Sequence, residues 1–510
     1  MAACANRRST LPRLTTAVLG VLLALAMVVL TACSPNSGED DLSRLNIGAT
    51  AAPPTLDPTA SDAAAIPQVL LYNVYETLVK LDSTGELIPL LAQRWQVSPD
   101  RLTYTFDLDP QATFASGAPL TAESVVWNIE RMTNEDTTAV LAQQMSVVES
   151  ATAVDEDTLT VTLKQPSNNW LFNMASSAGV VMEPDAAGDR AQTPAGSGPY
   201  TVSTFAPGQR VVLSKSEQYW GTPPRFDEVT FRYFADPNAM NSAMLSGQLD
   251  IISNLQAPQS IDQFEDPARF SIVRGTTNGE VVLSYNNESP ALSDPRVRQA
   301  ITLAIDRASL LRTVWNNEGM LIGSMVPPTD PWYEDLSERW PYDPDRAREL
   351  LAEAGATDLV LRLRVPTLPY ATASARTIAA QLAEVGIRVE VDELEFPARW
   401  LDVVLTQADY DMSIVSHVEP RDIVKFADPD YYFRYDNPEF QRLIAEADTA
   451  DEATQIELMR QAAKLLADDA AANWLFLLPN LVIARAGITG ISPNATSLSF
   501  DLTTLASARN

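Results

Sequence analysis

The stretch LVLRLRVPTLPYATASARTIAAQLAEVGIRVEV, residues 359–391, decides the fold class of this chain. Apolar and polar residues alternate from Leu359 to Val365 and again from Ile387 to Val391, which predicts two strands. Between them, apolar residues at helical spacing predict a helix that ends at Gly386. A strand, a helix and a strand at this spacing form a βαβ unit with parallel strands. We therefore predict an α/β fold with a parallel sheet, to which residues 410–416 add a strand.

Other segments carry start signals for helices and the alternation of half-buried strands. Asp-Pro pairs at 294–295 and 343–344 predict an N-cap followed by a proline in the first helical position. Residues 104–108 and 159–163 alternate apolar and polar side chains, which predicts a sheet with one face in water. Thr121 is the expected N-cap of a helix between these two strands.

The N-terminus has the pattern of an export signal. Three arginines precede an uninterrupted small and apolar run over residues 17–30, and residues 1–32 contain no acidic side chain. This run is short for a membrane span but suits the apolar part of a signal peptide. Leu30-Thr31-Ala32-Cys33 resembles the lipobox of bacterial lipoproteins, in which the cysteine receives the lipid. We predict a signal peptide over 1–32, lipid attachment at Cys33 and a flexible tether over 33–44. The alternative is a buried cysteine behind an ordinary membrane anchor.

The composition limits the partners of the chain. It has 36 basic and 66 acidic residues and a net charge of −30, which becomes −33 when the three arginines of the leader are removed. Such acidity argues against binding to nucleic acid or lying flat on anionic lipid. Cys4 would leave with the leader, so no internal disulfide is expected. A chain of 510 residues is long enough to bury a core of ordinary size without one.

Most catalytic motifs are absent from the sequence. His417 is the only histidine, which excludes zinc sites that need two. A G-x-S-x-G elbow, an S-x-x-K motif, a P-loop and a G-x-G-x-x-G turn are also missing. We therefore expect no enzyme, no cofactor and no metal site. With this many acidic residues, a carboxylate pair for glycoside hydrolysis stays open as an alternative.

Short motifs in a fixed order run along most of the chain. They are Pro54–Pro58, Tyr75–Val79, Leu91–Ser98, Tyr104–Phe106, Pro119–Val126, Gly196–Tyr200, Tyr219–Trp220, Asp294–Arg307 and Tyr342–Leu351. Together they resemble the family-5 extracellular solute-binding proteins of ABC transporters, the oligopeptide, dipeptide and nickel-binding group. The resemblance covers residues 45–485. One departure lies at Phe114–Gly117, where alanine and serine stand in place of the family's phenylalanine or histidine with aspartate.

The resemblance implies a two-lobed, type II periplasmic-binding-protein fold with an extra subdomain in the first lobe. Its lobes would close about a hinge on a solute and deliver the solute to a permease and ATPase complex. We expect a monomer, held by its lipid on the outer face of the cytoplasmic membrane. The expected boundaries are 45–80, 196–285 and 481–510 for lobe I, 81–195 for the extra subdomain and 286–480 for lobe II. The chain would cross between the lobes at Val281–Asn286 and Leu475–Val482.

The candidate ligand-binding residues follow the strand that is predicted to end at Ser416. Ligands of open α/β sheets bind beyond the carboxyl ends of strands, where His417, Glu419, Arg421 and Asp422 emerge. The resemblance implies that an aspartate shortly after this strand pairs with the ammonium group of a peptide. Asp422 is our first choice for that role and Glu419 the second. The alternative is a solvated loop in which Arg421 pairs with either carboxylate.

Further candidates lie outside this loop. The backbone and amide of Tyr285 and Asn286, at the first expected crossing, would face the ligand, or else the two residues pack at the hinge. Trp400 would stack on the ligand, and Trp315, Trp332 and Trp340 are candidates for the same role. The alternative for all four is packing in the core.

Three functions follow from these expectations. The first is the lipid-anchored binding component of an importer for peptides or similar small solutes. The second is a receptor on the same fold for a nickel chelate, an opine, a sugar or haem. The third is a surface adhesion or signalling protein that reuses the fold.

Overall fold

The computed structural model describes residues 43–133 and 137–508. The predictions for the signal peptide, for Cys33 and for the tether up to residue 42 lie outside the described residues. Residues Arg44–Asn510 form one compact unit. In the described part of the chain, no helix is both long and apolar enough to cross a bilayer.

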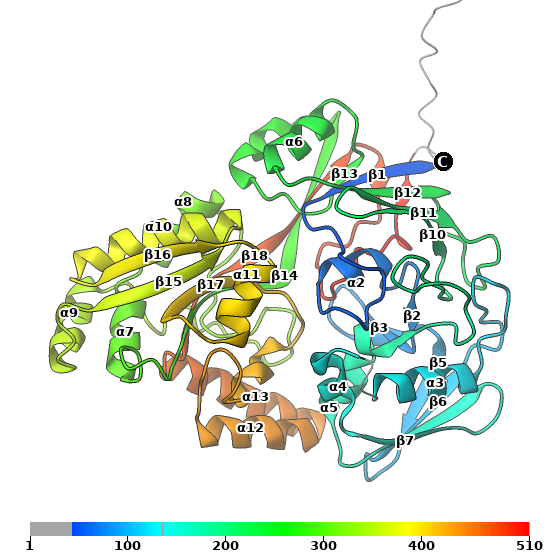
Figure 1. Ribbon diagram of the computed structural model, residues 1–510, viewed down its shortest axis with the longest axis horizontal. Coiled ribbons are helices and arrows are strands. Elements are labelled where there is room, and N and C mark those ends of the chain that lie inside the picture. Colours follow the sequence, from blue (N-terminus) through cyan, green and yellow to red (C-terminus); the bar gives the residue numbers. More distant parts are fainter. Residues whose placement is uncertain (1–42, 134–136, 509–510) are drawn as a thin grey trace, which may run out of the picture. The chain divides into compact units, whose positions relative to one another are not determined.

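A ten-stranded mixed sheet runs through this unit, in the order β10-β11-β12-β1-β13-β18-β14-β17-β15-β16 (Figure 1). Its strands are β1 (Arg44–Ala49), β10 (Tyr200–Ala206), β11 (Arg210–Lys215), β12 (Glu228–Tyr233), β13 (Ile251–Ile252), β14 (Phe270–Tyr285), β15 (Val360–Pro366), β16 (Arg388–Leu394), β17 (Met412–His417) and β18 (Ala472–Arg485).

The predicted βαβ unit is confirmed. β15 and β16 are parallel, paired from Val360 with Arg388 to Pro366 with Leu394, and α10 (Pro369–Glu384) connects them. Ile378 of α10 is completely buried against the sheet, as its helical spacing predicted. Gly386 follows α10 with a φ of 89°, a left-handed conformation that glycine adopts without strain. β17 joins β15 in parallel, which confirms the additional strand.

The apolar core is divided into two main parts. One part surrounds β1 and β10–β12 and is continued by the cluster under α6 (Pro237–Leu245); we call this part lobe I. The other part surrounds β15–β17 and the helices beside them, and we call it lobe II. The long strands β14 and β18 pair with each other and contribute side chains to both parts (Figure 1). These two strands therefore form the connection expected of a hinge.

The first crossing lies upstream of its predicted position. The pairing of β14 with β18 shifts between Thr276 and Glu280, and the core changes there from lobe I to lobe II. Residues 281–285, where the crossing was predicted, are already packed inside lobe II. Their apolar character reflects that burial, whereas the crossing itself is the polar stretch before them. The other boundaries of the lobes stay predictions.

A second sheet of four antiparallel strands lies within the region expected to be the extra subdomain. Its order is β5-β6-β8-β7, with β5 (Ala92–Val97), β6 (Thr103–Leu108), β7 (Val148–Ala153) and β8 (Thr158–Leu163). Side chains alternate between buried and half-buried along β6 and β8, which confirms the predicted sheet with one wet face. Its buried face is continuous with the core of lobe I.

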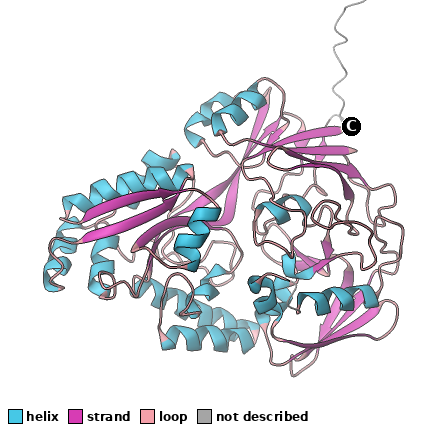
Figure 2. Ribbon diagram, viewed as in Figure 1, coloured by secondary structure: helices cyan, strands magenta, loops and turns pink. Residues whose placement is uncertain are grey.

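Caps start the helices where the sequence predicted them. Thr121 caps α3 (Ala122–Met132), Asp294 caps α7 (Pro295–Leu303) and Asp343 caps α9 (Pro344–Glu353). Figure 2 shows how the helices and strands are distributed. The remaining elements are α2 (Ala65–Leu70), β2 (Glu76–Thr77), β3 (Val79–Leu81), β4 (Leu87–Pro89), α4 (Ala139–Met145), α5 (Asn168–Asn173), β9 (Val180–Val181), α8 (Arg307–Trp315), α11 (Ala398–Trp400), α12 (Pro438–Thr449), α13 (Glu452–Asp468), β19 (Ile488–Thr489) and β20 (Ala506–Ser507).

Candidate ligand-binding site

The loop after β17 lies where the two lobes meet. β17 is inserted between β14 and β15, and its last residue, His417, pairs in register with Glu280 at the crossing of β14. The chain then turns through Arg421, whose φ of 60° is left-handed, into a 3₁₀ turn over Asp422–Ala427. The strand thus delivers its polar end to the boundary between the lobes, as expected for a ligand site in an open sheet.

His417 and Asp422 hold each other below the surface of this boundary. The Nδ1 atom of His417 lies 3.0 Å from the Oδ2 atom of Asp422, and its Nε2 atom lies 2.8 Å from the hydroxyl of Tyr432. The Tyr432 hydroxyl also contacts the Ser284 hydroxyl at 2.8 Å. Only 8% of His417 and 5% of Asp422 is exposed. Asp422, the first choice for a ligand carboxylate, is therefore engaged with the imidazole.

Glu280 is a buried carboxyl group that sequence reasoning missed. It is 1% exposed, and its Oε2 atom has no hydrogen-bond partner in the described residues. Burial, and then the negative charge of Asp422, raise the pKa of Glu280 well above its usual value. The sequence offered one signal for this residue: Glu280 is an acidic residue directly before the apolar run Val281–Tyr285.

Glu419 is the carboxylate of the loop that retains access to open space. It forms an ion pair with Lys425, with an N–O distance of 3.4 Å, and 35% of its side chain is exposed. Burial and the neighbouring charge of Asp422 raise the pKa of Glu419. Burial opposes the charge on Lys425, but Glu419 and Asp422 outweigh it and raise the pKa of that ammonium group.

Arg421 reaches from lobe II onto lobe I. Its guanidinium lies 3.6 Å from the ring centre of Phe172 on α5 and 4.9 Å from that of Trp332. Burial lowers the pKa of Arg421 to about 10. The alternative for this loop, in which Arg421 pairs with Glu419 or Asp422 in solvent, does not form. Asp422 contacts His417, Glu419 contacts Lys425, and Arg421 stacks on aromatic rings.

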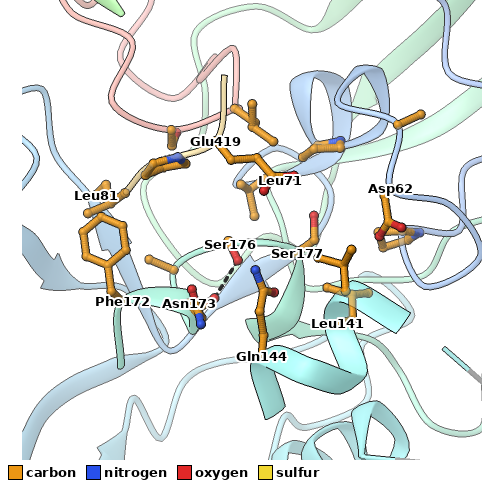
Figure 3. Close-up of a pocket in the computed structure, with 18 of the residues that line it drawn as sticks. Asp62, Leu71, Leu81, Leu141, Gln144, Phe172, Asn173, Ser176, Ser177 and Glu419 are labelled. Atoms are coloured by element: carbon orange, nitrogen blue, oxygen red, sulfur yellow. Dashed lines mark hydrogen bonds between the residues drawn. The ribbon is translucent and has the colours of Figure 1, made fainter. Parts of the chain in front are cut away.

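A pocket opens between lobe I and the tip of this loop (Figure 3). It amounts to about 750 Å³ with the open solvent at its mouth included. Its lining is Pro58, Ser61, Asp62, Ala63, Pro67, Leu71, Leu81, Val140, Leu141, Gln144, Phe172, Asn173, Ala175, Ser176, Ser177, Glu419, Pro420, Ser497 and Leu498.

The lining combines apolar walls with a few polar groups. Figure 3 shows Glu419 on one side of the pocket and Gln144 and Ser177 on the other. Among the described residues that line it, Asp62 and Glu419 are charged and none is basic. The Asp62 carboxylate accepts a hydrogen bond from the Thr138 hydroxyl at 2.5 Å. Such a site can accept a cationic or donor-rich group while its walls hold an apolar one.

The remaining predicted residues lie away from this pocket. Tyr285 is completely buried in the lobe II core, with its hydroxyl 3.2 Å from that of Thr302. The Asn286 amide donates to the carbonyl oxygens of Ala408 and Tyr410 at 3.0 and 3.2 Å. Both residues thus pack within lobe II, after the crossing and neither at the pocket nor at the crossing itself.

Trp400 has a supporting position. It is buried, its Nε1 atom donates to the Ser413 hydroxyl at 3.1 Å, and its ring packs edge-on against Tyr432 at 6.0 Å. Trp400 therefore contacts the tyrosine that holds His417 and does not line the pocket. Trp315 and Trp332 are also buried, and Trp340 is partly buried against the lobe II core.

The lobe I lining was not predicted from the sequence. It comes from segments around residues 58–81, 140–144, 172–177 and 497–498, which are brought together only by folding. Across residues 43–133 and 137–508, no group of three or more His, Cys, Asp or Glu side chains could hold a metal ion.

Comparisons with known proteins agree with this architecture. The family model for the bacterial extracellular solute-binding proteins, family 5, matches residues 86–461. The peptide transport periplasmic protein SapA of Salmonella typhimurium is 25% identical over 461 residues, 81% of this chain and 82% of the relative.

Two solved structures have the same fold. The peptide-bound DppA of Helicobacter pylori matches 91% of this chain and 98% of its own, with 21% identity and a TM-score of 0.82. AgaA of A. tumefaciens R10, bound to agropinic acid, matches 91% and 98%, with 23% identity and a TM-score of 0.78. They confirm the predicted two-lobed, type II periplasmic-binding-protein fold. With most of its length matched by the family model, the chain belongs to family 5 of the bacterial extracellular solute-binding proteins.

Proposed function

We propose that this chain is the extracytoplasmic binding component of an ABC importer and binds a peptide, or a similar small solute with a free amino group, between its lobes. The family and the peptide-transport relative support the class of solute. The observation that carries the proposal is the pocket, where carboxylates enter from both lobes, Asp62 from one and Glu419 from the other.

Glu419 is the group that we assign to the ammonium end of the solute. It lines the pocket and is partly exposed, whereas Asp422 is turned inward onto His417. Asp422 then acts as a positioning residue, because it holds the imidazole that also contacts Tyr432. A ligand ammonium beside Glu419 would share the carboxylate with Lys425. Charge-assisted hydrogen bonds of this kind are roughly twice as strong as neutral ones.

The rest of the lining suits the body of a peptide. Leu71, Leu141 and Phe172 supply apolar contact for side chains, and Gln144 and Asn173 supply amide groups for a peptide backbone. Because the lining comes from both lobes, parting of the lobes widens the site, and a bound solute favours their closure about β14 and β18. A solute that binds the closed form better shifts an existing equilibrium toward it. No chemical step is involved.

Attachment and partners complete the proposal. Cys33 carries the lipid that holds the protein on the outer face of the cytoplasmic membrane. The protein acts as a monomer and hands its solute to a permease driven by an ATPase. Genes for such a permease and ATPase beside this one would separate import from adhesion or signalling.

The test begins with a thermal-shift screen of free-amine peptides of two to five residues, because a ligand at about 100 times its Kd adds about 2.7 kcal/mol to stability. Calorimetry then compares the best peptide with its N-acetylated form. We expect Glu419→Gln to weaken the free-amine peptide at least tenfold, since removing one partner of a desolvated pair costs about 2–5 kcal/mol. The acetylated peptide should bind wild type poorly and lose little more in the variant.

Two controls make the result specific. Glu452→Gln removes an exposed carboxylate of lobe II and should leave the affinity unchanged. Asp422→Asn should weaken both forms of the peptide alike, because it disturbs His417 and not the ammonium contact. An exposed ion pair contributes only about 0–1 kcal/mol. If neither Glu419→Gln nor Asp422→Asn changes the affinity by more than about twofold, the assignment of the loop as the ammonium site is wrong.

The receptor for an opine or a metal chelate on the same fold is less well supported. Such ligands present carboxylates of their own, and both charged groups of this lining are carboxylates. Including agropinic acid and a nickel–histidine complex in the thermal-shift screen tests this alternative directly.

A further inference from the structure

The two lobes also touch at a place outside the pocket. The C-terminal end of α12, in lobe II, meets the start of α5 and the turn between β5 and β6, in lobe I. Figure 1 shows α12 beside α5, on the opposite side of the unit from the crossing of β14 and β18. A contact between the lobes away from the hinge must break when the lobes part.

Hydrogen bonds run in both directions across this contact. Arg101 donates to the carbonyl oxygen of Thr449 at 2.9 Å and also to that of Ala450. The Asn168 amide donates to the carbonyl oxygens of Ala447 and Ala450, both at 2.9 Å. In the other direction, the Asp448 carboxylate accepts from the backbone N–H of Asn169 at 2.8 Å.

Each of the two helix ends receives hydrogen bonds from the opposite lobe. The last carbonyl groups of α12 lack the N–H partners that a longer helix would supply, apart from that of Ala447, which accepts from the N–H of Ala450 at 3.4 Å, and they receive the side chains of Arg101 and Asn168. A cation near a helix C-terminus is also favoured by the helix dipole. The first turn of α5 leaves N–H groups free in the same way, and Asp448 takes one of them. When the lobes separate, these groups must return to water.

Arg101 has an unusual backbone conformation for a residue with a long side chain. Its φ is 59°, in the left-handed region that glycine and asparagine favour over arginine. The side chain extends from this turn to α12 and also donates to the Asn168 amide oxygen. An arginine in a glycine-like conformation therefore contacts the other lobe through Thr449 and Ala450, and its own lobe through Asn168.

We propose that Arg101, Asn168 and Asp448 form a latch that stabilises the closed arrangement of the lobes without touching the solute. None of the three lines the pocket. They are positioning residues: they set the fraction of closed protein, and the apparent affinity scales with the fraction of the binding-competent form. The inference rests on the hinge closure in the proposed function and extends it, because the latch should act equally on every solute.

The test measures the distance between the lobes in protein without solute. The chain's two cysteines, Cys4 and Cys33, both precede the described residues, so replacing them with serine leaves no background. Spin labels are then placed at Glu130→Cys on α3 and Glu384→Cys on α10, both exposed. Pulsed electron paramagnetic resonance reports the distribution of distances between them.

The main variant is Arg101→Gly, because glycine suits the backbone of this turn while the side chain is removed. Asp448→Ala removes the latch residue of lobe II and its hydrogen bond from the N–H of Asn169. Arg94→Ala is the matched control, since it removes an exposed arginine of the same small sheet, whose ion pair among the described residues is with Asp107 on the neighbouring strand. Melting temperatures show that each variant is folded. Affinities for the peptide panel are measured in parallel.

We expect a closed population in wild type and in the control, and at least a threefold smaller one in both latch variants. Affinities should fall by one common factor for every peptide that binds. Unchanged distance distributions in folded variants, or a wild type with only the long distance, would overturn the latch. If the distances shift but no peptide binds, the latch stands and the proposed function fails.

Discussion

Replacing Glu76 by glutamine should make the stability of this protein less dependent on pH. Glu76, on β2, is 1% exposed. Its Oε1 atom accepts a hydrogen bond from the Tyr219 hydroxyl at 2.9 Å, and its Oε2 atom accepts one from the Trp220 Nε1 at 3.0 Å. Burial raises the pKa of this carboxyl from 4.5 to about 7, although both hydrogen bonds oppose the rise.

The size and sign of the effect follow from this pKa. The folded protein keeps its proton at Glu76 up to about pH 7, whereas the unfolded chain releases it near 4.5. The contribution to stability is therefore complete below the unfolded pKa and is lost as the pH rises through the folded one. At about 1.36 kcal/mol for each pKa unit, the loss is about 3 kcal/mol. A glutamine is neutral like the protonated acid: its amide oxygen can accept from Trp220, and its NH2 group can donate to the Tyr219 hydroxyl, which then acts as the acceptor. It therefore carries no such loss.

Guanidinium unfolding, followed by tryptophan fluorescence at several pH values, measures the difference. Between about pH 4 and pH 8, the free energy of unfolding of Glu76→Gln should rise by about 3 kcal/mol relative to wild type. Other buried acids, Asp330 among them, titrate in the same range, but they cancel in this comparison. Glu123→Gln, which alters an exposed carboxylate of α3, should run parallel to wild type. If Glu76→Gln also runs parallel, the buried carboxyl does not hold a proton and the reasoning fails.

Two further predictions concern the ends of segments. Cys33→Ala should abolish labelling by a fatty-acid probe and release the protein from the membrane fraction, since stable anchoring needs about two acyl chains; labelling that persists would contradict the anchor. Thr121→Ala should lower the free energy of unfolding by about 1 kcal/mol, because Thr121 and Ser124 form a capping box at the start of α3, whereas Thr121→Ser should restore most of it.

Local signals predicted much of this fold because they act within a few residues. The alternation in 359–391 gave the correct pairing of β15 and β16, and the Asp-Pro pairs gave the starts of α7 and α9. The prediction placed the crossing of β14 too far along the chain because it relied on a local apolar run. An apolar run marks where a strand is packed inside a core. The residues that cross between the two cores are polar, whether half-buried, as Thr276 and Thr277 are, or buried, as Asn278 and Glu280 are.

The pocket could not be predicted in the same way. Asp62, Gln144 and Phe172 lie in segments with no shared motif, and they meet Glu419 only after the lobes have formed. Two of the candidates from the sequence, Tyr285 and Asn286, follow the crossing in the chain, yet packing inside lobe II takes their side chains away from the boundary.

The choice between Asp422 and Glu419 shows where local reasoning ends. Both carboxylates follow the same strand, and nothing in their order says which one faces a solute. The backbone of Arg421 separates the two, because its left-handed turn sends the chain back so that Asp422 meets His417, while Glu419 lines the pocket. Arginine is an uncommon residue in that conformation, and its side chain packs on Phe172 in the other lobe and on Trp332 in its own. The orientation of Glu419, the carboxylate that we propose for the solute, thus depends in part on a contact between the lobes. Replacing Phe172 should therefore disturb Asp422 and Glu419 together.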